Sequence, residues 1–262
     1  MDLGLQGKTA IVAAASKGLG KAVAAALARE GCKVVMFSRD RAAIEAAAAE
    51  IAVEGALIVP LQADVTVPDD LQRVVHTTIE RFQTVDVLYN NAGGPKPGMF
   101  DSLTDDDWLN AVDLNLMSAI RLTRLCLPYM RKKRWGREII GPSSSVKQPL
   151  PTLMLSNSVR SATTAWAKTL ADQVAGDGIT VNTLAPGRID TERVRQIDDD
   201  VAERTGRSRE EVEADAMKTI PLQRYGQPAE FGAAAAFLAS QQAAYITGVT
   251  LLVDGGLFRG TY

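Results

Sequence analysis

Short apolar runs alternate with helix-patterned segments along almost the whole chain. The runs suited to strands lie at 8–15, 33–40, 56–64, 85–91, 137–144, 179–186 and 249–256. Helical spacing occupies the segments between them, at 21–31, after 40 to about Val53, and at 68–82, 104–130, 153–175 and 227–240. Strand–helix alternation of this kind builds a parallel sheet covered by helices, and strands this apolar belong in a sheet that is buried on both sides. We therefore predict a doubly wound α/β fold with a mainly parallel, seven-stranded sheet and helices on both faces.

The segment 188–226 interrupts this alternation. It is charged and helical in pattern, and it lies between the sixth strand and the helix that follows. A polar insertion after the carboxyl end of a strand is where a lid over a ligand cleft would lie; a solvated helical excursion is the alternative. No linker or second core is evident, so we expect residues 1–262 to form a single domain with a lid-like excursion at about 188–226.

Composition argues against several classes of partner. A net charge of -2 gives no general attraction to nucleic acid or anionic lipid. Cys32 and Cys126 stand at unrelated spacing, which indicates neither a disulfide framework nor a metal site and favours a reducing compartment. The first ten residues lack a signal-peptide pattern, and no apolar run is long enough to span a membrane. We therefore expect a cytoplasmic protein without a metal, nucleic-acid or membrane partner.

The sequence AAASKGLG (13–20) follows the first strand and opens directly into a helix. The start of a helix exposes unpaired N–H groups and a positive dipole end, which suit a pyrophosphate, and glycines let the backbone approach it. Gly18 and Gly20 are present, whereas Ala14 stands where a first glycine is expected. Taken alone, this loop is also compatible with an ordinary tight turn.

Further motifs along the chain make it more specific that the glycine-rich loop binds a dinucleotide, because they follow one another in the order known from one family. They are Asp64-Val65, Asn90-Asn91-Ala92-Gly93, Asn115 in DLNLMS, Ser145 in SSSV, Pro186-Gly187 in NTLAPG, and the terminal GVTLLVDGG. With them the chain resembles the short-chain dehydrogenase/reductase family and is similar to its 3-oxoacyl-acyl-carrier-protein reductases. The resemblance implies a Rossmann-type fold and hydride transfer between a nicotinamide cofactor and a carbonyl compound or acyl thioester. It also implies a homo-oligomer, a tetramer that pairs through helices 104–130 and 153–175 and through 227–256.

The resemblance also implies a set of cofactor-binding residues. They are Ala14, Ser16, Lys17, Gly18, Leu19, Gly20, Arg39, Asp64, Val65, Asn91, Ala92, Gly93, Arg160, Pro186, Gly187, Ile189 and Thr191. An acidic residue at the end of the second strand would repel a 2′-phosphate, but this strand ends in FSRD and offers Arg39, with Lys17 expected near the same ribose. Two cations there favour NADP(H), although Asp40 could weaken the preference and both cations could be merely solvated.

The family's catalytic tyrosine and lysine are missing. They should stand four residues apart on one helix face, and LSNSVRSATTAWAKTLA (155–171) carries Ser156 and Arg160 at those places. Ser158 offers a competing register, but its partner four residues on is Ala162. Serine is a much weaker acid than a phenol of pKa about 10, and an arginine with a pKa above about 12 does not relay protons.

The remaining candidate catalytic residues are Ser145, Asn115 and Lys147. The resemblance assigns carbonyl polarisation to Ser145 and a water-linked proton path to Asn115; both could instead be structural. Lys147 lies on the loop expected to rim the site and could donate a proton if it were desolvated, or it could be a solvated lysine. We predict an NADP(H)-dependent oxidoreductase with an atypical proton donor. One alternative is a catalytically impaired dinucleotide-binding protein that acts as a sensor or scaffold. Another is a structural subunit that binds nothing, but the cofactor motifs argue against it.

Overall fold

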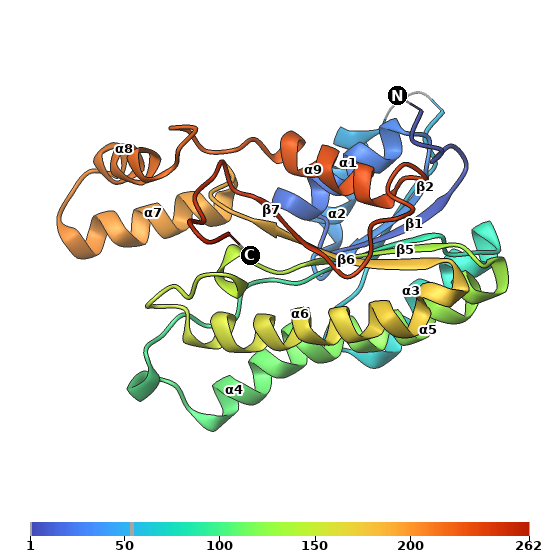
Figure 1. The fold of residues 1–262 in the computed structure, drawn as a ribbon, viewed down its shortest axis with the longest axis horizontal. Helices are drawn as coiled ribbons and strands as arrows, with labels where there is room; N and C mark the ends of the chain where they lie inside the picture. Colours follow the sequence, from blue (N-terminus) through green and yellow to red (C-terminus); the bar gives the residue numbers. More distant parts are fainter. Residues whose placement is uncertain (1, 53–54, 262) are drawn as a thin grey trace.

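A seven-stranded sheet forms the centre of the computed structural model, which describes residues 2–52 and 55–261 (Figure 1). The strand order is β3-β2-β1-β4-β5-β6-β7, and every neighbouring pair is parallel. The strands are β1 (Thr9–Ala13), β2 (Lys33–Ser38), β3 (Ile58–Gln62), β4 (Val87–Asn91), β5 (Gly136–Gly141), β6 (Ile179–Pro186) and β7 (Thr250–Val253). The predicted doubly wound fold is confirmed.

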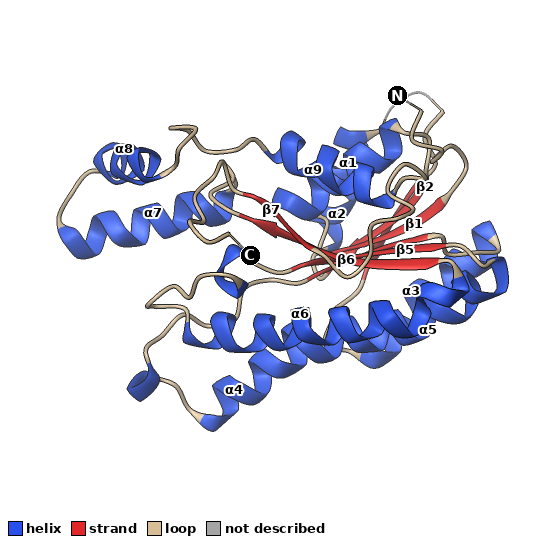
Figure 2. Ribbon diagram, viewed as in Figure 1, coloured by secondary structure: helices blue, strands red, loops and turns tan. Residues whose placement is uncertain are grey.

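Helices cover both faces of the sheet, which Figure 2 shows between two helical layers. One layer contains α1 (Gly18–Arg29), α2 (Arg41–Ile51) and α9 (Pro228–Ala239), and the other contains α3 (Pro68–Phe82), α5 (Ser118–Lys133) and α6 (Met154–Val174). Each layer buries its own apolar cluster against the sheet. The strands are therefore buried on both sides, as their continuous apolar runs predict.

Most helix boundaries lie within a few residues of their predicted positions. Thr104 and Ser208 each cap the start of a helix in a reciprocal capping box, with Asp107 and Glu211 respectively. The first helix begins at Gly18 rather than at 21, because the glycine-rich loop itself enters the helix. The predicted end of the second helix, near Val53, lies outside the described residues.

The predicted helix 104–130 is two helices joined by a π-helical turn. Helix α4 (Asp105–Val112) leads into the turn at Asp113–Met117, and α5 continues from it. A π turn accommodates one extra residue, and such turns occur frequently at functional sites. The turn carries Asn115, one of the predicted catalytic residues.

The order of the strands places a crevice beside β1. The chain adds β2 and β3 on one side of β1 and then crosses to add β4 on the other side. At such a switch point the connections leave the carboxyl ends of the two strands in opposite directions, which leaves room for a ligand. The ends of β1 and β4 carry the glycine-rich loop and the NNAG sequence.

The excursion at 188–226 contains α7 (Glu192–Thr205) and α8 (Arg209–Thr219), which project beyond the carboxyl end of β6 (Figure 1). Its base is held by Asp198, a fully buried carboxylate on α7. Arg188 forms an ion pair with Asp198, and the Tyr225 hydroxyl donates to it at 2.9 Å. The excursion is thus anchored to the end of β6 by a buried polar contact.

Candidate functional site

The glycine-rich loop forms a tight cradle at the start of α1. A Cβ atom at position 20 would lie 2.3 Å from the carbonyl oxygen of Ala14, so only glycine fits there. Gly18 has a φ of +54°, and Ala14 itself adopts +51°, in the left-handed region where an alanine is strained by about 1 kcal/mol. Lys17 precedes the helix without a side-chain cap, which leaves the N–H groups of the first turn available. The cradle fits a pyrophosphate group of a dinucleotide.

A second hollow lies where the adenosine ribose of a dinucleotide is expected. It is lined by Arg39, Gln62, Ala63, Asp64, Asp70 and Arg73. Arg39 is exposed and forms no ion pair within the described part of the chain. The Asp40 carboxylate forms no ion pair with Arg39 and accepts a hydrogen bond from the Ala43 N–H at 3.0 Å, which caps α2. Arg39 therefore lacks a direct ion-pair partner among the described residues, while the carboxylate of Asp64 lines the same hollow.

Two other cations, Lys17, which was expected near this ribose, and Arg73, which lines the hollow, have ion-pair partners. Lys17 pairs with Glu192 of the excursion at 2.6 Å, although both side chains are about 70% exposed and such a pair contributes little stability. Arg73, which the sequence did not single out, pairs with Asp70 at 2.5 Å and donates to the Gln62 carbonyl at 2.9 Å. Arg39 is thus the cation most available to a phosphate.

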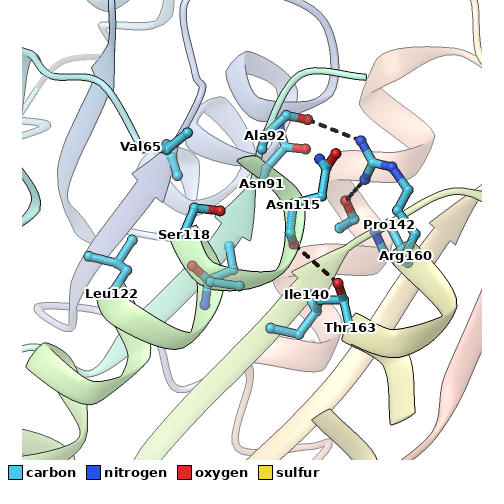
Figure 3. Close-up of a pocket in the computed structure, with 14 residues that line it drawn as sticks. Val65, Asn91, Ala92, Asn115, Ser118, Leu122, Ile140, Pro142, Arg160 and Thr163 are labelled. Carbon is cyan, nitrogen blue, oxygen red and sulfur yellow. Dashed lines mark hydrogen bonds between the residues drawn. The ribbon is translucent and has the colours of Figure 1, made fainter. Parts of the chain in front are cut away.

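A pocket opens at the switch point between β1 and β4 (Figure 3). It collects five of the predicted site residues, Val65, Asn91, Ala92, Asn115 and Arg160. The other lining residues come from strand ends and from the facing helices: Ala13, Asn90, Ser118, Ala119, Leu122, Ile140, Gly141, Pro142 and Thr163. The pocket therefore connects the expected cofactor face with the helix that carries the altered catalytic pair.

Arg160 lies at the rim of this pocket with its guanidinium turned toward the ends of β4 and β5 (Figure 3). It donates to the carbonyl oxygens of Gly141 at 3.2 Å, Gly93 at 3.1 Å and Ala92 at 3.4 Å. Burial lowers the pKa of Arg160 to about 10, and repulsion from Arg193 acts in the same direction. The pKa is below the expected value of more than about 12, yet the group stays charged at neutral pH.

Asn115 reaches the same carbonyl as Arg160. Its side-chain amide donates to the Gly93 oxygen at 2.9 Å, and its backbone carbonyl accepts from the Thr163 hydroxyl at 3.1 Å (Figure 3). This hydrogen bond connects the π-helical turn, which carries Asn115, to α6, which carries Thr163. The side-chain oxygen of Asn115 is buried and has no hydrogen-bond partner among the described residues, so it can accept a bond from a ligand or water.

Ser156 and Arg160 share the buried face of α6. Ser156 is 5% exposed, one turn before Arg160, whereas Ser158 lies on the exposed face. The side chains of Ser156 and Arg160 therefore point into the protein, whereas Ser158, the alternative position for the tyrosine, points to solvent. No tyrosine or lysine replaces the pair within this helix face, because the exposed Lys168 lies two turns further on.

The two remaining predicted catalytic residues lie on the turn after β5. Ser145 is 1% exposed, and its hydroxyl has no hydrogen-bond partner in the described chain. Lys147 is exposed and therefore lacks the desolvation that its proposed acid role requires. Ser143, a hydroxyl that the sequence reasoning passed over, is only half-buried and accepts from the Ser145 N–H at 3.2 Å. Neither serine lines the pocket.

The other predicted cofactor residues have visible local roles. Asp64 accepts from the Thr66 N–H at 2.9 Å and forms a turn, and the Thr191 hydroxyl caps α7. Gly187 packs so closely on Asp254 that an added Cβ would lie 2.5 Å from it. Pro186 ends β6, Ile189 is buried, and Ser16 and Leu19 lie within the glycine-rich loop. Thr191 faces Gly18, so the excursion begins directly over the cradle.

Tyr89 is a phenol close to the site that the sequence reasoning missed. It is fully buried on β4, and a Cβ at Gly141 would lie 2.5 Å from its hydroxyl oxygen. That hydroxyl has no hydrogen-bond partner among residues 2–52 and 55–261. Burial raises the pKa of Tyr89, while the charge of Arg160 lowers it. Sealed from solvent, this phenol cannot contact a substrate directly.

Glu138 is a buried carboxyl group beneath the pocket. It lies on β5, and one of its oxygens accepts from the Thr123 hydroxyl and, at 2.9 Å, from the side-chain amide of the pocket residue Asn90. Its other oxygen has no partner within the described residues. Burial raises the pKa of Glu138 from an ordinary 4.5 to about 7, and the two hydrogen bonds only partly oppose this rise.

Replacing Glu138 with glutamine is expected to stabilise the protein at pH 8 by about 3 kcal/mol. A carboxyl whose pKa is higher in the folded state binds its proton more tightly there, so stability falls as pH rises from about 4.5 to about 7. Glutamine is neutral throughout and keeps the same acceptor. Urea unfolding at pH 5 and pH 8 measures the effect; an equal stability difference at both pH values would contradict it.

Metal and membrane features are lacking in the described residues. No cluster of three or more His, Cys, Asp or Glu side chains there is placed to hold a metal ion. None of the described helices combines the length and the apolar character needed to cross a membrane.

Comparison with known proteins gives matches along nearly the whole chain. Residues 13–258 match a family model described as enoyl-(acyl carrier protein) reductase. The chain is 34% identical over 255 residues to the 3-oxoacyl-[acyl-carrier-protein] reductase of Synechocystis sp., covering 97% of this chain and 98% of the relative. It is 35% identical over 261 residues to that of Escherichia coli, covering 98% and 99%.

A solved structure shows the same architecture. The L-sorbose reductase of Gluconobacter frateurii, crystallised with NADPH and L-sorbose, superposes with a TM-score of 0.94 at 30% identity, over 99% of this chain and 100% of that one. The relatives are thus named for reducing different molecules, an acyl-carrier-protein derivative and a sugar.

Proposed function

Because the chain belongs to the short-chain dehydrogenase/reductase family, we propose that it is an NADPH-dependent reductase of carbonyl or acyl thioester compounds. The observation that carries this proposal is the common place of the glycine cradle, the NNAG sequence and the pocket with Arg160 and Asn115 at the carboxyl ends of β1 and β4. Residues 1–262 would act as one domain, with 188–226 as the lid over the site. The chain's own residues would hold the substrate oxygen, exclude water and organise the proton.

The preference for NADPH is supported by the hollow around Arg39. The exposed guanidinium has no carboxylate partner in the described chain, and the nearby Asp40 is occupied as a helix cap. A planar guanidinium matches the oxygens of a 2′-phosphate. The similar L-sorbose reductase was crystallised with NADPH, which agrees with this preference.

The bound cofactor would supply the hydride, and the protein must then stabilise the negative charge that appears on the substrate oxygen. Arg160 carries a buried positive charge at the pocket rim, and Asn115 has a free side-chain oxygen that can hold a water molecule. Such preorganised groups can contribute substantially to rate. The proton is the weak point, because Ser156 is a poor acid and Lys147 is exposed. We propose that water admitted beside Asn115 delivers it.

A second candidate reaction is reduction of a carbon–carbon double bond conjugated to a carbonyl group. The observation that favours it is the replacement of the phenol by a serine and of the ammonium by a buried guanidinium. In this reaction the negative charge rests on an enolate oxygen, which Arg160 can stabilise without giving up a proton, and the carbon can be protonated by water. The description of the matching family as enoyl reductase agrees with this chemistry.

Stopped-flow measurement of NADPH oxidation tests both candidates. We expect turnover with a panel of ketones, 3-oxoacyl thioesters and their α,β-unsaturated counterparts. A higher rate on the unsaturated compounds would select the second reaction, and a higher rate on ketones the first. Tight NADPH binding without oxidation of any compound would instead support a catalytically impaired sensor or scaffold.

We also propose a homotetramer, supported by two sets of exposed apolar side chains. One set lies on and before α4, where Met99, Phe100 and Leu109 are each about two-thirds exposed. The other set runs from α9 to β7 and consists of Phe237, Tyr245, Val249 and Leu251. Apolar patches rimmed by polar residues mark interfaces. Light scattering should give about four times the 28.0 kDa chain mass, and Leu251→Glu should halve it. A monomer at micromolar concentration would contradict the proposal.

A further inference from the structure

Arg193 differs from most of the other arginines of the excursion. Those neighbours form ion pairs: Arg188 with Asp198, Arg195 with Asp190, Arg207 with Asp215, Arg209 with Glu213, and Arg224 with Glu230. Arg193 has no carboxylate partner in the described part of the chain, and its side chain donates only to the neutral Gln196 amide at 3.3 Å. The adjacent Glu192 is engaged by Lys17 instead. Within the described part of the excursion, Arg193 thus shares the lack of an ion pair only with Arg204, which lies near the far end of α7.

Arg193 and Arg160 approach the same short stretch of backbone. The guanidinium of Arg193 lies 3.6 Å from the position of a Cβ at Gly94, while Arg160 donates to the carbonyl of the preceding residue, Gly93, at 3.1 Å. They are close enough that the charge of Arg193 lowers the pKa of Arg160. Two cations from separate elements, α6 and α7, therefore converge on the loop after β4.

An anion would relieve this convergence, in which Arg160 is buried and Arg193 is exposed. Arg160 is 7% exposed, and the groups that accept its hydrogen bonds are all neutral carbonyl oxygens, so its buried charge has no counter-ion among the described residues. A buried charge is ordinarily paired, and two like charges repel more strongly where the dielectric is low. Guanidinium groups offer planar forks that match the two oxygens of a carboxylate.

We propose that Arg160 and Arg193 together bind a carboxylate group of the substrate, so that the preferred substrates are oxo acids or their unsaturated counterparts. The inference rests on the proposed reductase function and names the substrate class of that site. The cofactor's own phosphates have other places in the chain, at the cradle of Gly18 and Gly20 and in the hollow of Arg39. The carboxylate would also draw α7 over the pocket, since Arg193 belongs to the excursion.

The test compares phenyl-substituted 2-, 3- and 4-oxo acids with their methyl esters, which differ in charge. We expect the unaltered protein to favour at least one acid over its ester in kcat/KM. Arg193→Gln should reduce that preference at least tenfold by slowing the acid much more than the ester. Arg204→Gln is the matched control, because Arg204 is an exposed arginine on the same helix without an ion pair in the described chain. It should change neither rate.

Calorimetry makes the test independent of turnover. The same acids are titrated into the complex with NADP⁺, which cannot reduce them, and NADPH is titrated into each variant. Weaker acid binding in Arg193→Gln with unchanged NADPH affinity supports the proposal even if no compound is reduced. Loss of NADPH affinity with equal loss for acid and ester would show that Arg193 binds a cofactor phosphate. That result, or failure of every acid to bind the unaltered complex, would overturn the proposal.

Discussion

A protein carrying both Ser156→Tyr and Arg160→Lys is expected to reduce ketones about 10²- to 10⁴-fold faster than the unaltered chain, since a positioned acid contributes about that much to rate. Position 156 lies on the inward face of α6, one turn before position 160, so a phenol and an ammonium placed there would be neighbours. The ammonium would lower the pKa of the phenol toward neutrality. The rate should be measured as kcat/KM with NADPH in excess.

Either change alone should give much less. A phenol beside a guanidinium that already donates to three carbonyl oxygens gains no titrating partner, and a lysine without the phenol has no acid to tune. Groups that act as one unit contribute in a non-additive way. The four-way comparison of the unaltered chain, the two single variants and the double variant measures this coupling directly.

The design needs a control for the added ring. Because Ser156 is buried, a tyrosine there could overpack the surroundings of α6 and cost about 1 to 3 kcal/mol of stability. Ser158→Tyr puts the same ring on the exposed face of the same helix and should change neither activity nor melting temperature. If the double variant folds, binds NADPH as before and gains no ketone activity, loss of the acid is not the deficit. Lys147→Ala in the unaltered chain then tests whether Lys147 supplies the proton.

Arg39→Asp is expected to reverse the cofactor preference, with a change of about 10²- to 10³-fold in the ratio of NADPH to NADH affinity. Hydrogen bonds to a charged group contribute about 1.5 to 3 kcal/mol each, and an aspartate would repel the 2′-phosphate while accepting from the ribose hydroxyls of NADH. Fluorescence titration of both cofactors at 0.15 M salt gives the ratio. The contribution of an exposed cation falls with salt, so the unaltered preference should shrink at higher ionic strength.

Arg73→Gln is the companion variant for this experiment. Arg73 lines the same hollow but already pairs with Asp70, so its removal should weaken NADPH binding less than removal of Arg39. Equal affinity of the unaltered protein for the two cofactors would contradict the assignment of Arg39. A larger effect at Arg73 than at Arg39 would move the phosphate site to the other side of the hollow.

Local patterns in the sequence were sufficient for the fold because each strand is a short apolar run, each intervening helix has helical apolar spacing, and some helices carry their own start signal. Thr104 with Asp107 and Ser208 with Glu211 are contacts between residues three apart, which a sequence shows directly. The inward placement of Ser156 and Arg160 follows for the same reason, since residues four apart share a helix face.

What the sequence could not show depends on contacts between distant residues. Glu138 looks like a charge near the edge of a strand, and only the tertiary contacts with Asn90 and Thr123 reveal a buried carboxyl. Likewise, Arg193 stands among many charges, and only the structure shows that most of the neighbouring arginines have ion-pair partners while Arg193 has none among the described residues. A charged residue inside an otherwise apolar strand, as in REIIG, is the one signal that could have identified Glu138.

The π-helical turn at Asp113–Met117 shifts the spacing of the inward-facing residues by one position along the sequence. Because the π turn takes up one residue more than an α-helical turn, removing one residue from it should restore an ordinary α-helix while α4 and α5 keep their present directions. The cost of such a deletion would fall on the turn itself, which carries Asn115 to the pocket. The extra residue therefore serves the site and not the packing of the two helices.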